Sequence, residues 1–245
     1  MKKVFITGAN KSIGYETARQ LIQQGCYVYL GTRNLKNGQQ SVEKLKSEGL
    51  RNVEPIQIDI TDQASVDAAR KEIGGKTEIL DVLINNAGIS GGMPQKPASV
   101  DLNVLYEVFN VNLYGAVRTT KAFIDLLKNS SQPRIVNVTS GMASMTLCGN
   151  PDFQYRDYVG GIYGPSKAAL NMYTIALALE LRDTAFKVNA IDPGFTATDF
   201  NNHRGSGSVE VAGKRILKYA MIGTDGPTGK FISEEINPET GIVAF

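Results

Sequence analysis

The chain has 245 residues, of which 42% are hydrophobic and 20% are charged. A chain of this length can bury one large core, and this composition excludes the disordered and fibrous classes of protein. The formal net charge is only +2, without a long run of one sign, so electrostatics gives no support to a nucleic-acid partner or an anionic membrane surface, and we expect a small-molecule partner.

The cysteine and histidine content narrows the kind of site and the compartment. Cys26, Cys148 and His203 are the only residues of these two types, too few for a zinc site of the usual spacing or a disulfide framework, and we expect no metal. A reducing cytoplasm fits this usage best. The apolar run in MKKVFITG is too short for a signal peptide or a membrane span, so we expect a first strand there.

Short β-branched runs alternate with longer segments of helical period. Strands are predicted at 4–7, 27–32, 53–59, 80–85, 134–140, 187–192 and 230–233. Helices are predicted at 13–24, 35–48, 62–74, 100–128 and 163–182. This alternation predicts a Rossmann-type α/β fold, a doubly wound parallel sheet of about seven strands with helices on both faces, in a single domain that spans residues 1–245.

Two irregular stretches, at about 141–162 and 193–208, follow predicted strands directly. Open α/β sheets bind ligands at the carboxyl ends of their strands, so we expect substrate loops here. The two stretches share a mostly apolar and aromatic set of side chains, namely Met142, Met145, Phe153, Tyr155, Tyr158, Phe195 and Phe200. Such a set favours a substrate with an apolar or aromatic body, although any one of these residues could equally pack its loop onto the domain.

The stretch TGANKSIG at 7–14 follows the first predicted strand and opens the first helix, which is the context of a dinucleotide-binding loop. Gly8 and Gly14 stand where such loops need a tight turn and close helix packing, and Ser12 stands where the backbone approaches the pyrophosphate. If Ser12 has a positive φ, serine costs roughly 1–2 kcal/mol there. Its hydroxyl could donate to a phosphate, or it could only cap the helix.

Six short segments, in this order and each beside the expected strand or helix, resemble the short-chain dehydrogenase/reductase family over nearly the whole chain. They are TGANKSIG at 7–14, NNAG at 85–88, NVN at 110–112, VNVTS at 136–140, YGPSK at 163–167 and PGFTAT at 193–198. Within the family, NKSIGYETARQL, GTRNLKNGQQSVEKLKSEG and DGPTGKFISEE resemble NADPH-dependent carbonyl reductases most.

The resemblance implies an NADP-dependent oxidoreductase that reduces a ketone, aldehyde or quinone to an alcohol. Two alternatives stay open, an alcohol dehydrogenase that works in the oxidative direction and a cofactor-binding sensor without chemistry. The gap between Ser140 and Tyr163 is longer than in tetrameric members and shorter than in monomeric carbonyl reductases, and the chain ends INPETGIVAF instead of in a VDGG-like strand. We therefore expect a monomer or a homodimer more than a tetramer.

Four residues carry the expected chemistry. Tyr163 and Lys167 are four residues apart on one helix face, so the ammonium should lower the pKa of the phenol from about 10 toward neutrality, where it can protonate a carbonyl oxygen. Ser140, at a strand end, can hydrogen-bond the same oxygen. The resemblance adds Asn112, whose counterpart in the family supports a water that links the lysine to solvent.

The end of the second strand indicates which cofactor is bound. NAD sites usually carry an acid there, whereas NADP sites carry a basic residue. Arg33 occupies the position, and Lys11 could reach the same 2′-phosphate, so NADPH is predicted. With the residues that the resemblance implies, the expected cofactor contacts are Gly8, Asn10, Lys11, Ser12, Ile13, Gly14, Arg33, Asp59, Ile60, Asn86, Ala87, Gly88, Tyr163, Lys167, Pro193, Gly194, Thr196 and Thr198.

Overall fold

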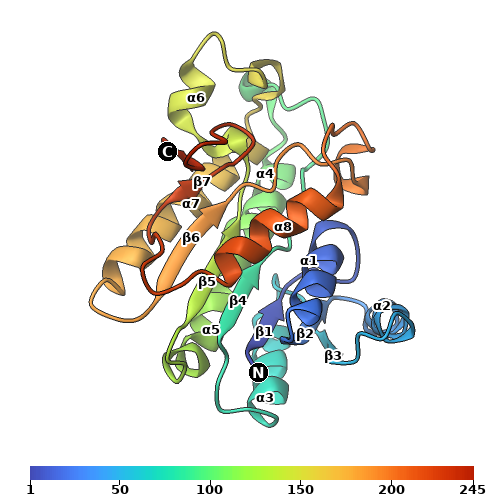
Figure 1. The fold of residues 1–245 in the computed structure, drawn as a ribbon. Helices are drawn as coiled ribbons and strands as arrows, with labels where there is room; N and C mark the ends of the chain where they lie inside the picture. Colours follow the sequence, from blue (N-terminus) through green and yellow to red (C-terminus); the bar gives the residue numbers. More distant parts are fainter.

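One sheet of eight strands runs through the computed structural model, which describes residues 1–245 (Figure 1). The strands are β1 (Lys3–Ile6), β2 (Tyr27–Thr32), β3 (Val53–Gln57), β4 (Val82–Asn85), β5 (Arg134–Val138), β6 (Lys187–Ile191), β7 (Phe231–Ile232) and β8 (Ile242–Val243). Their order in the sheet is β3-β2-β1-β4-β5-β6-β7-β8, and only β7 and β8 pair antiparallel. The predicted doubly wound sheet is confirmed. The eighth strand was not predicted, because a two-residue strand carries no readable alternation.

Eight α-helices connect and cover these strands. They are α1 (Ser12–Gln23), α2 (Leu35–Ser47), α3 (Gln63–Gly74), α4 (Leu102–Phe109), α5 (Ala116–Lys128), α6 (Met145–Gly149), α7 (Tyr163–Glu180) and α8 (Val209–Ala220). The helix expected over 100–128 is two helices joined by a π-helical turn, Asn110–Gly115. The prediction missed α8 although a start signal was present, since Ser208 caps it by accepting a hydrogen bond from the Val211 amide.

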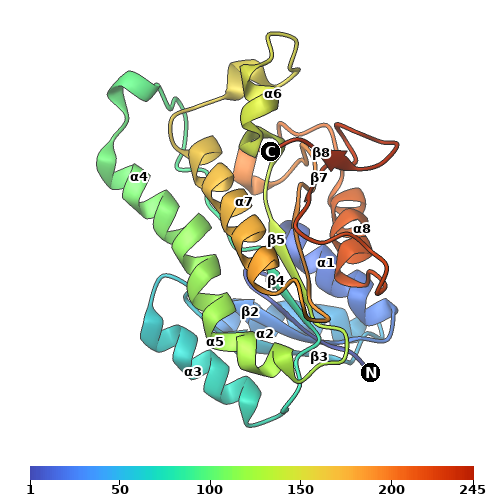
Figure 2. The ribbon, with the colours of Figure 1, turned by 90° about the vertical axis from the view of Figure 1, so that its left-hand side faces the viewer.

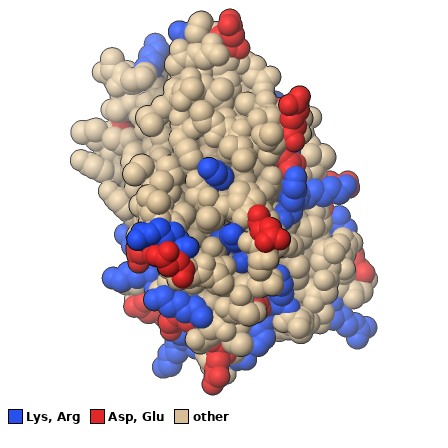
Figure 3. All heavy atoms as spheres, turned by 60° about the vertical axis from the view of Figure 1, so that its left-hand side comes forward, with Lys and Arg blue, Asp and Glu red and all other residues tan.

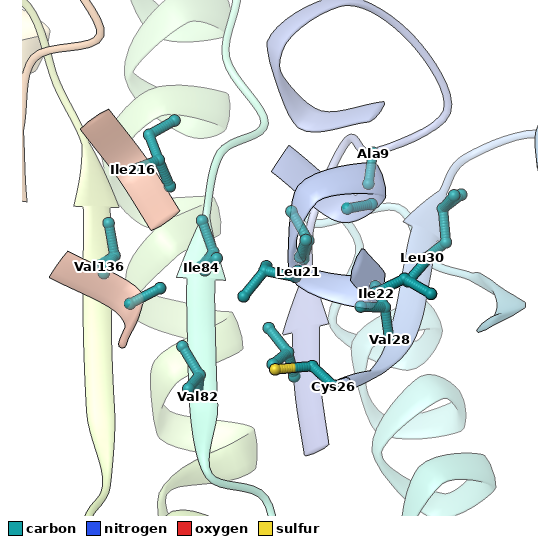
Figure 4. Packing of buried hydrophobic residues seen from close by; sticks show 14 of the residues in the cluster. Ala9, Leu21, Ile22, Cys26, Val28, Leu30, Val82, Ile84, Val136 and Ile216 are labelled. Atoms are coloured by element: carbon teal, nitrogen blue, oxygen red, sulfur yellow. The ribbon is translucent and has the colours of Figure 1, made fainter. Parts of the chain in front are cut away.

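The two faces of the sheet are buried under different helices, as the continuous apolar runs of the strands predict. Val4 and Ile84 belong to the hydrophobic cluster under α1, α2 and α8, whereas Phe5 belongs to the cluster under α3, α5 and α7 (Figure 2). Figure 4 shows Leu21 of α1 and Ile216 of α8 within the first cluster, beside the strands. This double burial holds the strands rigidly and fixes where their carboxyl ends lie.

The strand order reverses at β1, which has β2 on one side and β4 on the other. Ligands of open α/β sheets bind at such a reversal, outside the carboxyl ends of the strands. The segments that leave β1, β4, β5 and β6 begin at this edge, and they contain nearly all of the predicted site residues. The fold therefore gathers motifs that lie up to 190 residues apart in the sequence.

Candidate active site

The loop after β1 is shaped by two glycines. Gly8 has φ +63°, in the left-handed region that favours glycine. A Cβ added at Gly14 would lie 2.5 Å from Nδ2 of Asn86 and 2.6 Å from the carbonyl oxygen of Gly8. Because a backbone oxygen cannot move aside easily, only glycine lets α1 pack this closely under the loop. Such a loop at a helix N-terminus is a ready cradle for a phosphate group.

Ser12 adopts the positive φ that a glycine would take without cost, with φ +52°. A serine in this conformation is strained by roughly 1–2 kcal/mol. Lys11, and not Ser12, occupies the N-cap position of α1, and no side-chain cap bond is formed. The helix-capping interpretation of Ser12 is therefore wrong, and its hydroxyl is left without a partner in the protein.

Asn86 and Thr7 tie the first loop to the segment after β4. The Thr7 hydroxyl oxygen accepts hydrogen bonds from the amides of Asn86 (3.0 Å) and Ala87 (3.1 Å). In return, Nδ2 of Asn86 donates to the carbonyl oxygens of Thr7 (2.9 Å) and Gly8 (3.0 Å). These four bonds fix the first loop to the segment after β4 at the point where the strand order reverses, and we call the region outside these strand ends the groove.

The two predicted phosphate-binding cations differ in their surroundings. Arg33 is exposed and its guanidinium has no hydrogen-bond partner. Burial works to raise the pKa of Asp59, but hydrogen bonds from Thr61 and the charge of Arg33 outweigh it and lower that pKa. Lys11 instead forms an exposed ion pair with Asp199, 2.9 Å away in the loop after β6.

A polar pocket of about 450 Å³ opens between the first loop and α2. Its lining consists of Asn10, Lys11, Ser12, Tyr15, Asn37, Gln40, Ser41 and Lys44. Lys11 and Lys44 supply two positive charges and no acid faces them from the lining, so the pocket suits an anionic group. Ser41 donates to the carbonyl oxygen of Asn10 (2.8 Å), which fixes α2 against the loop.

Tyr163 and Lys167 lie on the first turns of α7, beside the end of β5. Nζ of the buried Lys167 donates to the carbonyl oxygen of Val138 at 2.8 Å, and burial lowers the pKa of this lysine to about 8. The predicted fall in the pKa of Tyr163 is wrong for this structure. Burial and then the charge of Asp192 raise that pKa, and only a hydrogen bond with Ser140 acts in the opposite direction.

Ser140 stands two residues beyond the end of β5, where it also caps the short turn Gly141–Ala143 by accepting from the Met142 amide at 3.3 Å. Its side chain is half-buried and interacts with that of Tyr163. The structure thus brings together Ser140, Tyr163 and Lys167 as predicted. An acceptor atom placed at the carboxyl end of β5 could therefore receive hydrogen bonds from the hydroxyls of both Ser140 and Tyr163.

Asn112 is a buried clamp, 1% exposed, in the π-helical turn. Its Oδ1 accepts from the amide of Ile89 (2.9 Å), and its Nδ2 donates to the carbonyl oxygen of Ile89 (3.0 Å) and to Oγ of Ser166 (3.0 Å). A Cβ added at Gly88 would lie 3.2 Å from Oδ1 of Asn112 and 3.4 Å from Nζ of Lys167. Asn112 therefore joins the segment after β4 to α7, and π turns are frequent at functional sites in proteins.

The other predicted cofactor residues fall into two groups. Ile13 and Ile60 turn their side chains toward the hydrophobic clusters. Pro193, Gly194, Thr196 and Thr198 form the turn after β6, in which Gly194 has φ +87° and the Thr196 hydroxyl donates to the Gly194 carbonyl oxygen at 3.1 Å. The loop that continues from this turn reaches the first loop through the ion pair of Asp199 with Lys11.

Asp192 is a site residue that the sequence analysis missed. It follows β6 directly and is 6% exposed, and its carboxylate accepts from the Ser233 hydroxyl (2.7 Å) and the Gly194 amide (3.0 Å). Burial raises its pKa, and its charge acts on Tyr163. An acid placed immediately before PGFTAT was the available signal. Asp199 is a second such residue, found only through its contact with Lys11.

Aromatic side chains of the two irregular stretches gather beside this centre. Ring centroids are 5.5 Å apart for Tyr155 and Phe195, and 5.9 Å apart for Tyr158 and Phe195. We call Tyr155, Tyr158 and Phe195 the aromatic wall. Phe200 packs edge-on against Tyr163 at 5.4 Å. Of the other predicted lining residues, Phe153 is buried and Met145 is 73% exposed, so the set does not act as one surface.

No group of three or more His, Cys, Asp or Glu residues is placed to hold a metal ion. No helix combines the length and the apolar character needed to cross a membrane.

Comparison with known proteins agrees with this arrangement. The sequence model of short chain dehydrogenases matches residues 2–208. A (+)-neomenthol dehydrogenase from Capsicum annuum is 32% identical and aligns with 92% of this chain and 93% of its own. The solved structure of salutaridine reductase from Papaver somniferum is 29% identical, with a TM-score of 0.83 over 94% of this chain and 99% of the other. An NADPH-bound carbonyl reductase from chicken fatty liver is 26% identical, with a TM-score of 0.84 over 100% and 99%.

Proposed function

Because this chain belongs to the short-chain dehydrogenase/reductase family, we propose that it is an NADPH-dependent enzyme that reduces a carbonyl group to an alcohol. The substrate class is a ketone, aldehyde or quinone with an apolar or aromatic body. The observation that carries the proposal is the meeting of Ser140, Tyr163 and Lys167 at the end of β5, beside the groove at the strand-order reversal.

The residues of the groove fit a dinucleotide. A Cβ at Gly8 or Gly14 would crowd Ala87, Asn86 or the loop's own backbone, so the two glycines keep the loop compact at the start of α1, where a phosphate would bind. The hydroxyl of Ser12, which has no partner in the protein, could donate to that phosphate. Asn86, Ala87 and Gly88 would line the ribose and ring, and Asp59 and Ile60 would lie at the adenine. Pro193, Thr196 and Thr198 would meet the carboxamide. The bound nicotinamide supplies hydride chemistry.

The protein's own groups handle the proton. Tyr163 has a raised pKa and stays protonated at neutral pH, so its hydroxyl can donate to the carbonyl oxygen as the alcohol forms. Ser140 would hold the same oxygen by a hydrogen bond. Lys167, whose lowered pKa lies near 8, places a proton-carrying amine behind Tyr163, and Asn112 keeps that helix in position.

The choice of NADPH over NADH rests on the basic residues. Arg33 is unpartnered at the end of β2, and Lys11 and Lys44 line the adjacent polar pocket. A 2′-phosphate would give these cations an acceptor that NADH lacks. The NADPH-bound carbonyl reductase described above supports the same choice.

The segments at about 141–162 and 193–208 are proposed as substrate loops, because they carry the aromatic wall and Phe200 beside Tyr163. Their side chains offer an apolar and aromatic surface with few charges. This is the basis for a substrate with an apolar body.

We further propose a cytoplasmic protein, monomeric or homodimeric. Cys26 and Cys148 are both free, which fits a reducing compartment. Large apolar side chains are exposed on α4 and α7, including Tyr106 (68%) and Met172 (61%), and Figure 3 shows few charged residues on the upper part of this side. Burial of this one face would form a dimer, and light scattering after gel filtration would measure the mass.

The decisive experiment follows NADPH absorbance against a panel of ketones, aldehydes, quinones and diketones. Tyr163→Phe should lower kcat by about 10²-fold or more while NADPH still binds, because only the proton donor is lost. Tyr106→Phe, on the exposed face of α4, is the matched control. Turnover only of alcohols with NADP⁺ would assign the oxidative direction, and binding without any turnover would assign a sensor.

A further inference from the structure

Glu235, three residues beyond the end of β7, lies at the meeting point of three segments that are far apart in the sequence. Its side chain is 19% exposed. Its Oε2 accepts from the amide of Phe195 at 2.9 Å, and its Oε1 accepts from the hydroxyl of Tyr155. The residue ends the segment DGPTGKFISEE, which carries part of the family resemblance, but the resemblance assigned it no role.

Arg215 of α8 completes the junction. Its Nη1 lies 3.4 Å from Oε2 of Glu235 and donates to the carbonyl oxygen of Pro193 at 2.8 Å. A Cβ added at Gly194 would overlap both Nη1 of Arg215 and Oε2 of Glu235. The ion pair therefore packs directly against the backbone of the turn Pro193–Thr196 and leaves that turn no room to shift on this side.

The same carboxylate also holds the aromatic wall. Tyr155 donates its hydroxyl to Glu235, and its ring contacts Phe195 at 5.5 Å and Phe153 at 5.7 Å. The acceptor raises the pKa of Tyr155, after the larger effect of burial, so its hydroxyl remains a donor. One oxygen of Glu235 thus fixes the turn after β6, and the other fixes the substrate loop at 141–162.

We propose that Glu235 is a positioning residue that sets the turn Pro193–Thr196 and the aromatic wall in one fixed relation. The inference deepens the proposed function and rests on it. Through its Phe195 bond, Glu235 places the turn against the nicotinamide half of the cofactor. Through its Tyr155 bond, it places the aromatic wall against the apolar body of the substrate, so that the reacting carbonyl meets Tyr163.

The first test separates the two halves of the cofactor by isothermal titration. Glu235→Ala should raise the Kd of NADP⁺ about tenfold, the scale of one lost hydrogen bond to a charged group, and leave the Kd of adenosine 2′,5′-bisphosphate within about twofold. Glu235→Gln keeps an acceptor for the Phe195 amide and should recover part of the loss. Glu234→Gln is the control, since its carboxylate pairs with Lys218 on the surface.

The second test measures coupling with Tyr155. Tyr155→Phe keeps the ring and removes only the hydroxyl, so it should raise the KM of the carbonyl substrate several-fold and leave the Kd of NADP⁺ unchanged. In the Glu235→Ala background the same change should have no further effect on KM. Effects that multiply in the double variant would overturn the proposed connection.

If Glu235→Ala or Glu235→Gln weakened the binding of NADP⁺ and of the bisphosphate equally, Glu235 would only support the fold. If neither ligand bound more weakly, Glu235 would have no positioning role. Both outcomes overturn the inference and leave the proposed function standing. A wild-type protein that binds no nicotinamide nucleotide would remove the proposed function itself, and the inference with it. Because Glu235→Gln preserves shape and acceptor, the test does not depend on the alanine variant folding.

Discussion

The two ends of the groove are built in different ways. At the first loop, the shape comes from backbone in close approach, with Gly8 and Gly14 packed against Asn86 and with few charged side chains. At the turn after β6, side chains contribute to the shape, with Glu235 accepting from the Phe195 amide and Arg215 donating to the Pro193 carbonyl oxygen. The two glycines of the first end come from one short stretch of sequence, which packs against the segment after β4, whereas the second end needs side chains from α8, from the segment after β7 and from the loop at 141–162.

If the first end depends on backbone packing, the largest effect should come from a single added methyl group. Gly14→Ala places a Cβ 2.6 Å from a backbone oxygen and should lower the free energy of unfolding by about 3 kcal/mol, with loss of cofactor binding. Urea unfolding measures the change. Gly223→Ala, where a Cβ meets nothing within 4 Å, should be neutral or slightly stabilising. Equal free energies of unfolding for Gly14→Ala and Gly223→Ala would show that backbone packing does not shape the first loop.

A pH series should report on the part of the site between these two ends, where Lys167 of α7 is buried beside the end of β5. The pKa of Lys167 is near 10.5 when unfolded and about 8 when folded, so the unfolded chain binds more protons between these values. The free energy of unfolding should therefore rise with pH from about 8 to 10.5, by up to about 3 kcal/mol.

Lys167→Met should lose this slope and be the more stable protein at pH 7, whereas Lys128→Met on the exposed side of α5 should keep it. Urea unfolding of the three proteins at several pH values supplies the comparison. A wild-type slope that persists in Lys167→Met would place its origin in another group.

The preference for NADPH over NADH tests the role of the basic residues beside the first loop. Arg33→Ala should raise the Kd of NADPH about tenfold and leave that of NADH nearly unchanged, since only the 2′-phosphate differs. Lys11→Ala should have a smaller effect, because Lys11 must leave its ion pair with Asp199 to bind a phosphate. Titrations with both nucleotides measure the ratio, and equal losses for both would place the cations elsewhere.

The smallest effect is expected at Ser12. Ser12→Gly relieves a left-handed φ of +52° and breaks no hydrogen bond in the protein, so stability should change by no more than about 1 kcal/mol. NADPH affinity should stay within a few-fold or improve, whereas Ser12→Leu should weaken NADPH and NADH together. Calorimetric titration, with melting curves in the absence of cofactor, decides between a loop that touches the cofactor and one that only begins a helix.

The contrast between the two ends also explains what the sequence could predict. Gly8 and Gly14 were identifiable because each has one local reason to be glycine, and Tyr163 with Lys167 because helical spacing makes them neighbours. The pKa of Tyr163 was not predictable, since it depends on burial and on Asp192 from another strand. Glu235 and Arg215 carry no local signal at all, because an ion pair 20 residues apart becomes meaningful only once α8 and β7 are placed.

The π-helical turn Asn110–Gly115 sets the rotational phase of the helix pair on either side of it. An α-helix advances about 100° per residue, and a π turn holds about one residue more than an α turn. Deleting one residue of the turn would therefore swing α4 about 100° around its axis relative to α5. The outward face that carries Tyr106 would roll toward a neighbouring helix, and the amide of Asn112 would leave Ile89. The extra residue of the π turn thus allows α4 to expose Tyr106 while Asn112, in the turn itself, holds the segment after β4.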